Sequence, residues 1–208
     1  MDHFVNRDDE LSRLRGCYES DDAEMVVVFG RRRLGKTHLV QHSLSDRDDA
    51  VVYQATETTS QVQLNEFVDI ASETFPGITQ IKQNWEALLG YLGDQDGIVV
   101  LDEFPYLIDA DESLPSVIQR LWDQRLQNTS GTLVLVGSSI SMMEEATLLG
   151  NSPLYGRFTE RLDLRPLNFA AAQEFVPDEC SPEERIFTWG IFGGVPYYLD
   201  GVDLGRDL

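Results

Sequence analysis

The chain has 208 residues, of which 42% are hydrophobic and 10% aromatic, so it can bury a sizeable core and is not disordered throughout. No apolar run approaches the roughly 20 residues that cross a bilayer, and the N-terminus lacks a signal-peptide pattern. The two cysteines, Cys17 and Cys180, form neither a CxxC pair nor a disulfide framework. These features predict a soluble protein of the reducing cytoplasm.

The charge balance is strongly acidic. Lys and Arg together number 16 against 36 Asp and Glu, which gives a formal net charge of −20. Only Lys36 and Lys82 are lysines, Asp outnumbers Glu, and the acids are spread along the chain. A dispersed acidic surface stays hydrated and repels phosphate backbones, so it disfavours non-specific binding of nucleic acid. This composition resembles the proteomes of salt-loving archaea; an ordinary acidic protein is the alternative.

Apolar runs and periodic segments alternate along the first 165 residues. The spacing of apolar side chains predicts helices, in chain order, in segments 8–18, 37–44, 64–71, 85–92 and 114–121. Short apolar runs predict buried strands at 25–29, 51–54, 98–101 and 133–136, with a fifth strand at 161–165. Alternation of buried strands with helices is typical of an α/β fold, a parallel sheet covered on both faces.

The character of the sequence changes after Pro166. Asn168 can cap a helix over residues 169–175, and residues 181–184 (SPEE) form a capping box with proline at the first helical position. We therefore interpret residues 1–165 as an α/β core and residues 166–208 as the start of a helical appendage.

Residues 30–37 read GRRRLGKT and match the pattern GxxxxGK[ST] at every fixed position. In such a loop the backbone N–H groups face the β-phosphate, and the next helix presents its positive N-terminal end. We expect Lys36 to bridge the β- and γ-phosphates and Thr37 to bind Mg²⁺. The expected nucleotide-binding residues here are Gly30, Arg31, Arg32, Arg33, Leu34, Gly35, Lys36, Thr37 and His38. At least two of the three arginines are expected to face solvent.

A second motif follows the third predicted strand. Residues 98–103 read IVVLDE, so two acids lie at the carboxyl edge of the sheet, where ligands of open α/β sheets bind. Together with the loop, Asp102 is expected to hold the Mg²⁺ shell, and Glu103 to orient and deprotonate an attacking water. The glutamate favours hydrolysis over phosphoryl transfer to a small molecule.

Three further candidates are less specific. Ser138 follows the fourth strand and is expected to hydrogen-bond the γ-phosphate or the attacking water; Ser139 is the alternative, unless it caps the next helix. Arg157 is a candidate for the positive charge that assists phosphate chemistry, with a surface ion pair as the equal alternative. His38 and His42 lie four residues apart, but ordinary packing or solvent exposure is favoured over a shared metal.

With these residues the chain resembles the archaeal ATPase family, in the AAA/STAND branch of P-loop NTPases. The similar segments, in order, are 4–11 (FVNRDDEL), 29–37, 101–104 (LDEF), 154–157 (LYGR), 164–167 (LRPL) and 193–199 (GGVPYYL). The resemblance implies that the first segment, with Val5 and Arg7, lies near the adenine. It also implies that Pro196, early in the lid, contacts the nucleotide. Asn6 stands where many relatives have glycine.

The family resemblance implies a three-layer P-loop NTPase fold with five parallel strands in the order 5-1-4-3-2, plus a short, truncated helical lid. It implies Mg²⁺-dependent binding and hydrolysis of ATP. An ATP-gated switch or scaffold with negligible turnover is the alternative. Relatives usually continue past segment 193–199 into a completed lid and a winged-helix module, so we expect a fragment or a minimal version. A homo-oligomer or a protein partner stays open, whereas no segment supports a DNA-handling motor.

Overall fold

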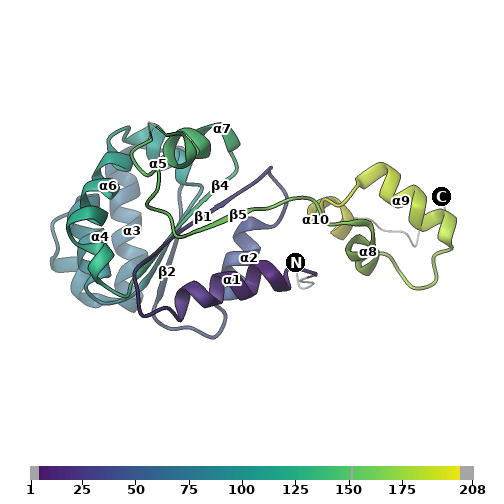
Figure 1. Ribbon diagram of the computed structural model, residues 1–208, viewed down its shortest axis with the longest axis horizontal. Helices are drawn as coiled ribbons and strands as arrows, with labels where there is room; N and C mark the ends of the chain where they lie inside the picture. Colours follow the sequence, from purple (N-terminus) through teal and green to yellow (C-terminus); the bar gives the residue numbers. More distant parts are fainter. Residues whose placement is uncertain (1–4, 151, 202–208) are drawn as a thin grey trace.

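The computed structural model describes residues 5–150 and 152–201. Its centre is a five-stranded parallel sheet in the order β2-β3-β4-β1-β5 (Figure 1). The strands are β1 (Glu24–Phe29), β2 (Ala50–Gln54), β3 (Ile98–Asp102), β4 (Thr132–Gly137) and β5 (Glu160–Asp163). Read from the opposite edge, this order is the predicted 5-1-4-3-2, so the fold prediction is confirmed.

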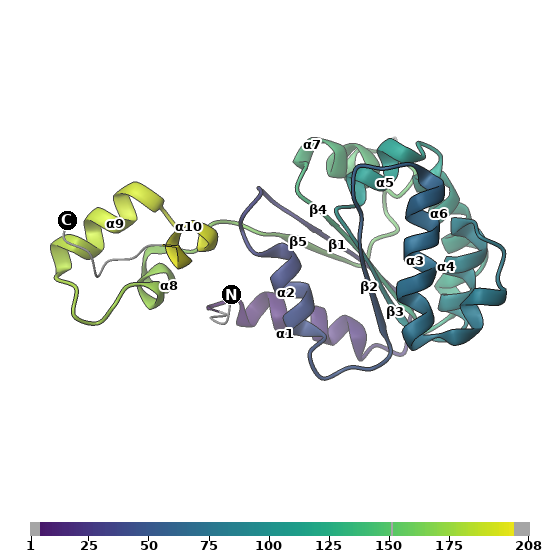
Figure 2. The same cartoon turned by 180° about the vertical axis from the view of Figure 1, so that it is seen from behind.

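Helices cover both faces of the sheet. The helices of this core are α1 (Asp8–Tyr18), α2 (Lys36–Ser43), α3 (Ser60–Thr74), α4 (Trp85–Gly93), α5 (Phe104–Ala110), α6 (Leu114–Gln124) and α7 (Ile140–Met143). Figure 2 shows α1 and α2 on one face and α3, α4 and α6 on the other. Successive strand side chains point to opposite faces, so Val26 packs towards α1 and α2 while Val27 joins the core under α3 to α7. Both faces of the sheet are therefore buried.

The predicted elements are found with small shifts of their ends. Two helices were not predicted: α5, and α10 (Pro196–Asp200). Both are too short to show a repeating apolar stripe, and each has proline in its first turn. In the described part of the chain, no helix combines the length and apolar character needed to cross a membrane.

The C-terminal helices form a small body beyond the carboxyl edge of the sheet (Figures 1 and 2). It consists of α8 (Phe169–Ala172), α9 (Pro182–Phe192) and α10. Leu167, Ala171, Ala172 and Leu199 make its own apolar cluster. The predicted caps are present: the Asn168 side chain accepts from the backbone N–H of Ala171, and Ser181 forms its capping box with Glu184. We call residues 166–201 the lid.

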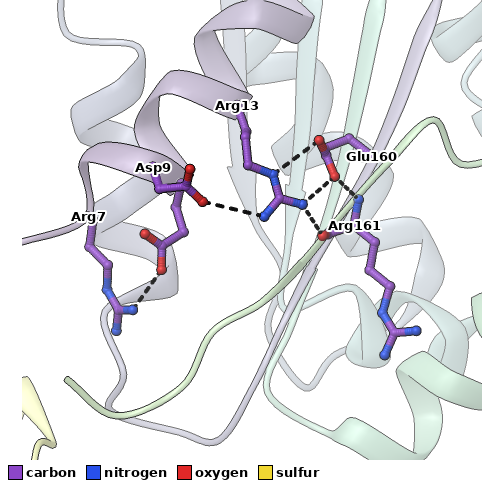
Figure 3. Close-up of polar contacts among 6 residues, drawn as sticks. Arg7, Asp9, Arg13, Glu160 and Arg161 are labelled. Carbon is purple, nitrogen blue, oxygen red and sulfur yellow. Dashed lines mark hydrogen bonds and ion pairs between the residues drawn. The ribbon is translucent and has the colours of Figure 1, made fainter. Parts of the chain in front are cut away.

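Arginines attach helix α1 to strand β5, as Figure 3 shows for Arg13, and to the connection between β5 and the lid. Arg13 donates from Nε and Nη2 to the Glu160 carboxylate, at 3.2 and 2.5 Å, and from Nη2 to the backbone oxygen of Arg161 at 2.7 Å. Arg7 donates from Nη2 to the backbone oxygen of Arg165 at 2.7 Å. The N-terminal segment is thereby held beside the start of the lid.

A close backbone contact closes the lid on itself. The backbone N–H of Leu167 donates to the carbonyl of Gly194 at 2.7 Å. A Cβ atom on Gly194 would lie 1.8 Å from the Leu167 carbonyl oxygen, well inside van der Waals contact. Only glycine fits where the two ends of the lid meet.

We expect Gly194→Ala to destabilise the protein by about 1–3 kcal/mol, because the added methyl group must push two backbone segments apart. Gly190→Ala is the matched control, since a Cβ there meets no atom within 4 Å and alanine favours a helix. Urea unfolding followed by fluorescence measures both. Equal stability of the two variants would contradict the assigned contact.

Candidate functional site

A buried lysine, Lys36, begins α2 at the end of the loop that follows β1. The ammonium group of Lys36 donates to the backbone carbonyls of Gly30 and Arg31, at 3.0 and 3.1 Å. Burial lowers the pKa of Lys36, while the carboxylates of Glu103 and Asp102 oppose that shift. The loop therefore holds a positive charge within reach of two acids.

The carboxylate of Asp102 connects this loop to the end of β3. Its Oδ2 accepts the hydroxyl hydrogen of Thr37 at 2.6 Å, and its Oδ1 accepts the backbone N–H of Glu103 at 2.8 Å. The residue is only 2% exposed. Burial raises the pKa of Asp102, and the hydrogen bond from Thr37 acts in the opposite direction. A hard cation beside this carboxylate and hydroxyl would match their chemistry.

Glu103 stands at the turn from β3 into α5. Its φ of 51° lies in the left-handed region, which a residue with a side chain seldom adopts. Its Oε1 accepts the hydroxyl hydrogen of Ser138 at 2.9 Å. Ser138 thus contacts Glu103, the predicted catalytic base, whereas Ser139 makes no side-chain capping bond to α7. The four residues Thr37, Asp102, Glu103 and Ser138 form one connected series.

A cavity of about 280 Å³ brings most of the predicted residues together. Of the predicted set, its lining includes Val5, Arg7, Arg32, Arg33, Leu34, Gly35, Lys36, Thr37, His38, Glu103, Ser138 and Pro196. Phe175 and Tyr197, both from the lid, complete the lining. The volume is close to the lower end for small-molecule sites. Core and lid therefore share one pocket.

Backbone strain concentrates around this cavity. The non-glycine residues with positive φ in the described chain are Asn6, Arg33, Asp96 and Glu103. Asn6 lies between two cavity residues, Val5 and Arg7, and its φ of 46° is a conformation that glycine adopts more readily than other residues. Arg33 and Glu103 line the cavity themselves. Left-handed residues gather at functional sites because the surrounding structure must enforce them.

The three loop arginines are exposed, in agreement with the expectation for at least two of them. Arg32 nevertheless donates from Nη2 to the Tyr106 hydroxyl at 3.3 Å, and Arg33 donates from Nη1 to the Tyr198 hydroxyl at 2.6 Å. These two arginines therefore point in different directions, one towards α5 and the other towards the lid.

Arg157 lies away from the cavity. It donates from Nε and Nη2 to the Asp123 carboxylate at 2.7 and 2.8 Å, and from Nη1 to the backbone oxygen of Pro153 at 3.0 Å. This is the surface ion pair that the sequence allowed as the alternative. Within this chain Arg157 does not join the residues around the loop.

The structure adds a positioning residue that the sequence did not reveal. Gln63 of α3 is fully buried; its Oε1 accepts from the Tyr53 hydroxyl at 2.9 Å, and its Nε2 donates to the backbone oxygen of Tyr106 at 3.1 Å. It therefore holds the first turn of α5, directly after Glu103. A glutamine one turn before Phe67 on the buried face of a helix was the available signal.

We expect Asp102→Asn to be more stable than the native chain at pH 7. Burial raises the pKa of Asp102 in the folded state. The protonated carboxyl therefore stabilises the fold fully below the pKa of the unfolded chain, and this stabilisation is lost as pH rises through the pKa of the folded chain. Asparagine does not ionise, so the variant avoids this loss, and its advantage in stability over the native chain should shrink as pH falls. Urea midpoints between about pH 4 and pH 8 measure it.

Asp123→Asn is the matched control with the opposite sign, because pairing with Arg157 lowers the pKa of Asp123. It should bring no gain at pH 7. If Asp102→Asn were less stable than the native chain at pH 7, burial would not be the dominant effect on this carboxylate.

A family model described as an ATPase domain predominantly from Archaea matches residues 4–202. An uncharacterized protein of Methanocaldococcus jannaschii is 41% identical over 201 residues, which are 97% of this chain and 44% of that protein. An uncharacterized ATP-binding protein of the same organism is 39% identical over 44 residues, 21% of this chain and 75% of its own length. The chain thus spans less than half of the longer relative.

Solved structures show the same fold at low sequence identity. The Walker-type ATPase of Pyrococcus abyssi superposes with a TM-score of 0.67 and 19% identity, over 94% of this chain and 65% of its own. A STAND protein of Pyrococcus horikoshii with a tetratricopeptide repeat sensor gives 0.63 and 20%, over 96% and 30%. The ORC2 protein of Aeropyrum pernix, solved as ADPNP and ADP complexes, gives 0.55 and 16%, over 90% and 54%.

Proposed function

Because this chain belongs to the family of ATPase domains found predominantly in Archaea, we propose that it binds ATP with Mg²⁺ and hydrolyses it to ADP and phosphate. In this proposal residues 1–165 are the nucleotide-binding core and residues 166–208 begin a lid. One observation carries it: the series from Thr37 through Asp102 and Glu103 to Ser138 lies beside the Lys36 ammonium.

The oxygen atoms of Thr37 and Asp102 fit a magnesium ion. A hydroxyl and a buried carboxylate held 2.6 Å apart are hard donors that Mg²⁺ accepts, with phosphate oxygens and water completing its shell. When bound, the ion would neutralise negative charge on the β- and γ-phosphates. The raised pKa of Asp102 supports this assignment, because a nearby cation restores the ionised carboxylate.

We assign hydrolysis of ATP to the turn from β3 into α5, which carries Glu103. A water oxygen attacks the γ-phosphorus as the bond from that phosphorus to the β–γ bridging oxygen breaks, and ADP leaves with the electron pair. Glu103 takes a proton from the water, and Ser138 orients its carboxylate through the 2.9 Å hydrogen bond. Lys36 exchanges its carbonyl partners for phosphate oxygens and stabilises the charge on them.

The cavity residues without an assigned role so far suit the adenine base of the nucleotide, and we call them the base half of the site. They include the apolar residues Val5, Phe175 and Pro196, the last two from the lid, and the polar residues Arg7 and His38. Arg7 is 8% exposed and donates to the Glu10 carboxylate at 2.8 Å. We assign the adenine to this half, because planar bases bind between apolar walls with a few polar groups at the edge.

We place this activity in a salt-rich, reducing cytoplasm. The net charge of −20 suits a surface hydrated against salt, and Cys17 and Cys180 are free thiols. A second copy or a protein partner is the macromolecular contact we propose, and a nucleic acid is disfavoured by the acidic surface. Arg157 would act in this reaction only across such a contact.

Phosphate release from ATP with Mg²⁺, measured from about 0.1 M to molar KCl, tests the proposal. Lys36→Ala should abolish both ATP binding and turnover, because the phosphates lose their buried positive partner. Glu103→Gln should retain ATP binding and lose turnover by at least about 100-fold, because it removes the proton acceptor.

Lys82→Ala and Glu86→Gln are matched controls at exposed positions outside the cavity, and both should release phosphate like the native chain. The assignment of Glu103 fails if Glu103→Gln keeps native turnover. The whole proposal fails if the folded native chain binds no nucleotide.

An ATP-gated switch with negligible turnover is the second candidate. The contact between loop residue Arg33 and lid residue Tyr198 favours it, because occupancy of the loop then bears directly on the lid. A native chain that binds ATP and releases no phosphate would select this candidate.

A further inference from the structure

The side chain of Arg33 joins the phosphate loop to the lid. Nη1 of Arg33 donates to the Tyr198 hydroxyl at 2.6 Å. The same guanidinium lies 4.7 Å from the ring centre of Tyr197 and 5.1 Å from that of Tyr198. The two rings contact each other edge to face, with centres 5.9 Å apart. Arg33 thus makes three favourable contacts with α10.

The backbone conformation of Arg33 directs its side chain towards these rings. Its φ of 70° places it in the left-handed region, unlike its neighbours Arg31 and Arg32. That conformation is unfavourable for arginine, so the surrounding contacts must hold it. The side chain of Arg32, one residue earlier, reaches Tyr106 on the other side of the loop. The direction of Arg33 is therefore a property of its backbone conformation and its partners together.

The element that Arg33 holds also forms part of the cavity wall. Helix α10 begins at Pro196, and both Pro196 and Tyr197 line the cavity together with loop residues 32–35. The contact between Leu167 and Gly194 fixes the segment just before α10. A link between the loop and α10 consequently sets the distance between the two walls of the cavity.

We propose that Arg33 is a positioning residue that fastens the lid wall of the nucleotide site to the phosphate loop. It acts through Tyr197 and Tyr198 and leaves the phosphates to the loop N–H groups and Lys36. The inference rests on the proposed function, since it concerns the spacing between the base half and the phosphate half of that site. It separates Arg33 from an arginine that binds phosphate directly.

Two ligands distinguish these roles: ATP occupies both halves of the site, and inorganic tripolyphosphate occupies the phosphate half alone. Calorimetry with Mg²⁺ would compare the native chain with Arg33→Gln, Tyr198→Leu and the double variant. Each single change should weaken ATP binding about tenfold and leave tripolyphosphate binding unchanged. The double variant should be no weaker than the weaker single variant, because both changes remove the same contact.

Arg120→Gln removes an equal charge from the exposed face of α6 and should leave both affinities at the native values. The inference is overturned if Arg33→Gln weakens both ligands while Tyr198→Leu weakens neither, since Arg33 would then bind phosphate. It is also overturned if ATP binds every variant as it binds the native chain. A native chain that binds neither ligand refutes the proposed function itself.

Discussion

The buried carboxylate of Asp102 sets the spacing on which the candidate site depends. One oxygen holds the Thr37 hydroxyl at the start of α2, and the other holds the backbone N–H that turns the chain into Glu103. A buried carboxylate is unfavourable unless hydrogen bonds or a cation compensate it. Parallel pairing of β1 with β4 and of β3 with β4 brings both partners to the same edge of the sheet. The sheet thus holds the two partners at a fixed distance, and the Asp102 carboxylate connects them.

The core and the lid differ in how much apolar surface they bury. The core buries both faces of a five-stranded sheet, whereas the lid has a small apolar cluster and leaves Ile186, Phe187 and Ile191 of α9 exposed. A body with little buried apolar surface opens at a lower free energy than the core. Contacts at the junction, such as those of Arg7 and Arg33, therefore have more influence on the lid than similar contacts have inside the core.

The spacing of apolar residues predicted the helices and strands, and two motifs of adjacent residues predicted the loop at 30–37 and the acids after β3. The strand order was implied by the family resemblance. What these patterns missed depends on contacts between distant residues. Arg33 and Tyr198 are 165 residues apart, and no local pattern pairs them. Gln63 looks like an ordinary helix residue until the carbonyl of Tyr106 lies against it. Arg157 had two equal interpretations, and no local pattern showed that folding places Asp123 beside it, where the two form an ion pair.

The edge strand β5 also affects whether copies of the chain aggregate through their sheets. An exposed edge offers unpaired N–H and C=O groups to any passing strand and is a common start of aggregation. Strand β5 is only four residues long, three of them charged, and the guanidinium of Arg13 already occupies the carbonyl of Arg161. Short length, charge and an engaged carbonyl are the devices by which natural sheets resist edge-to-edge pairing. The arginine that attaches α1 thereby also protects the sheet from growing beyond its fifth strand.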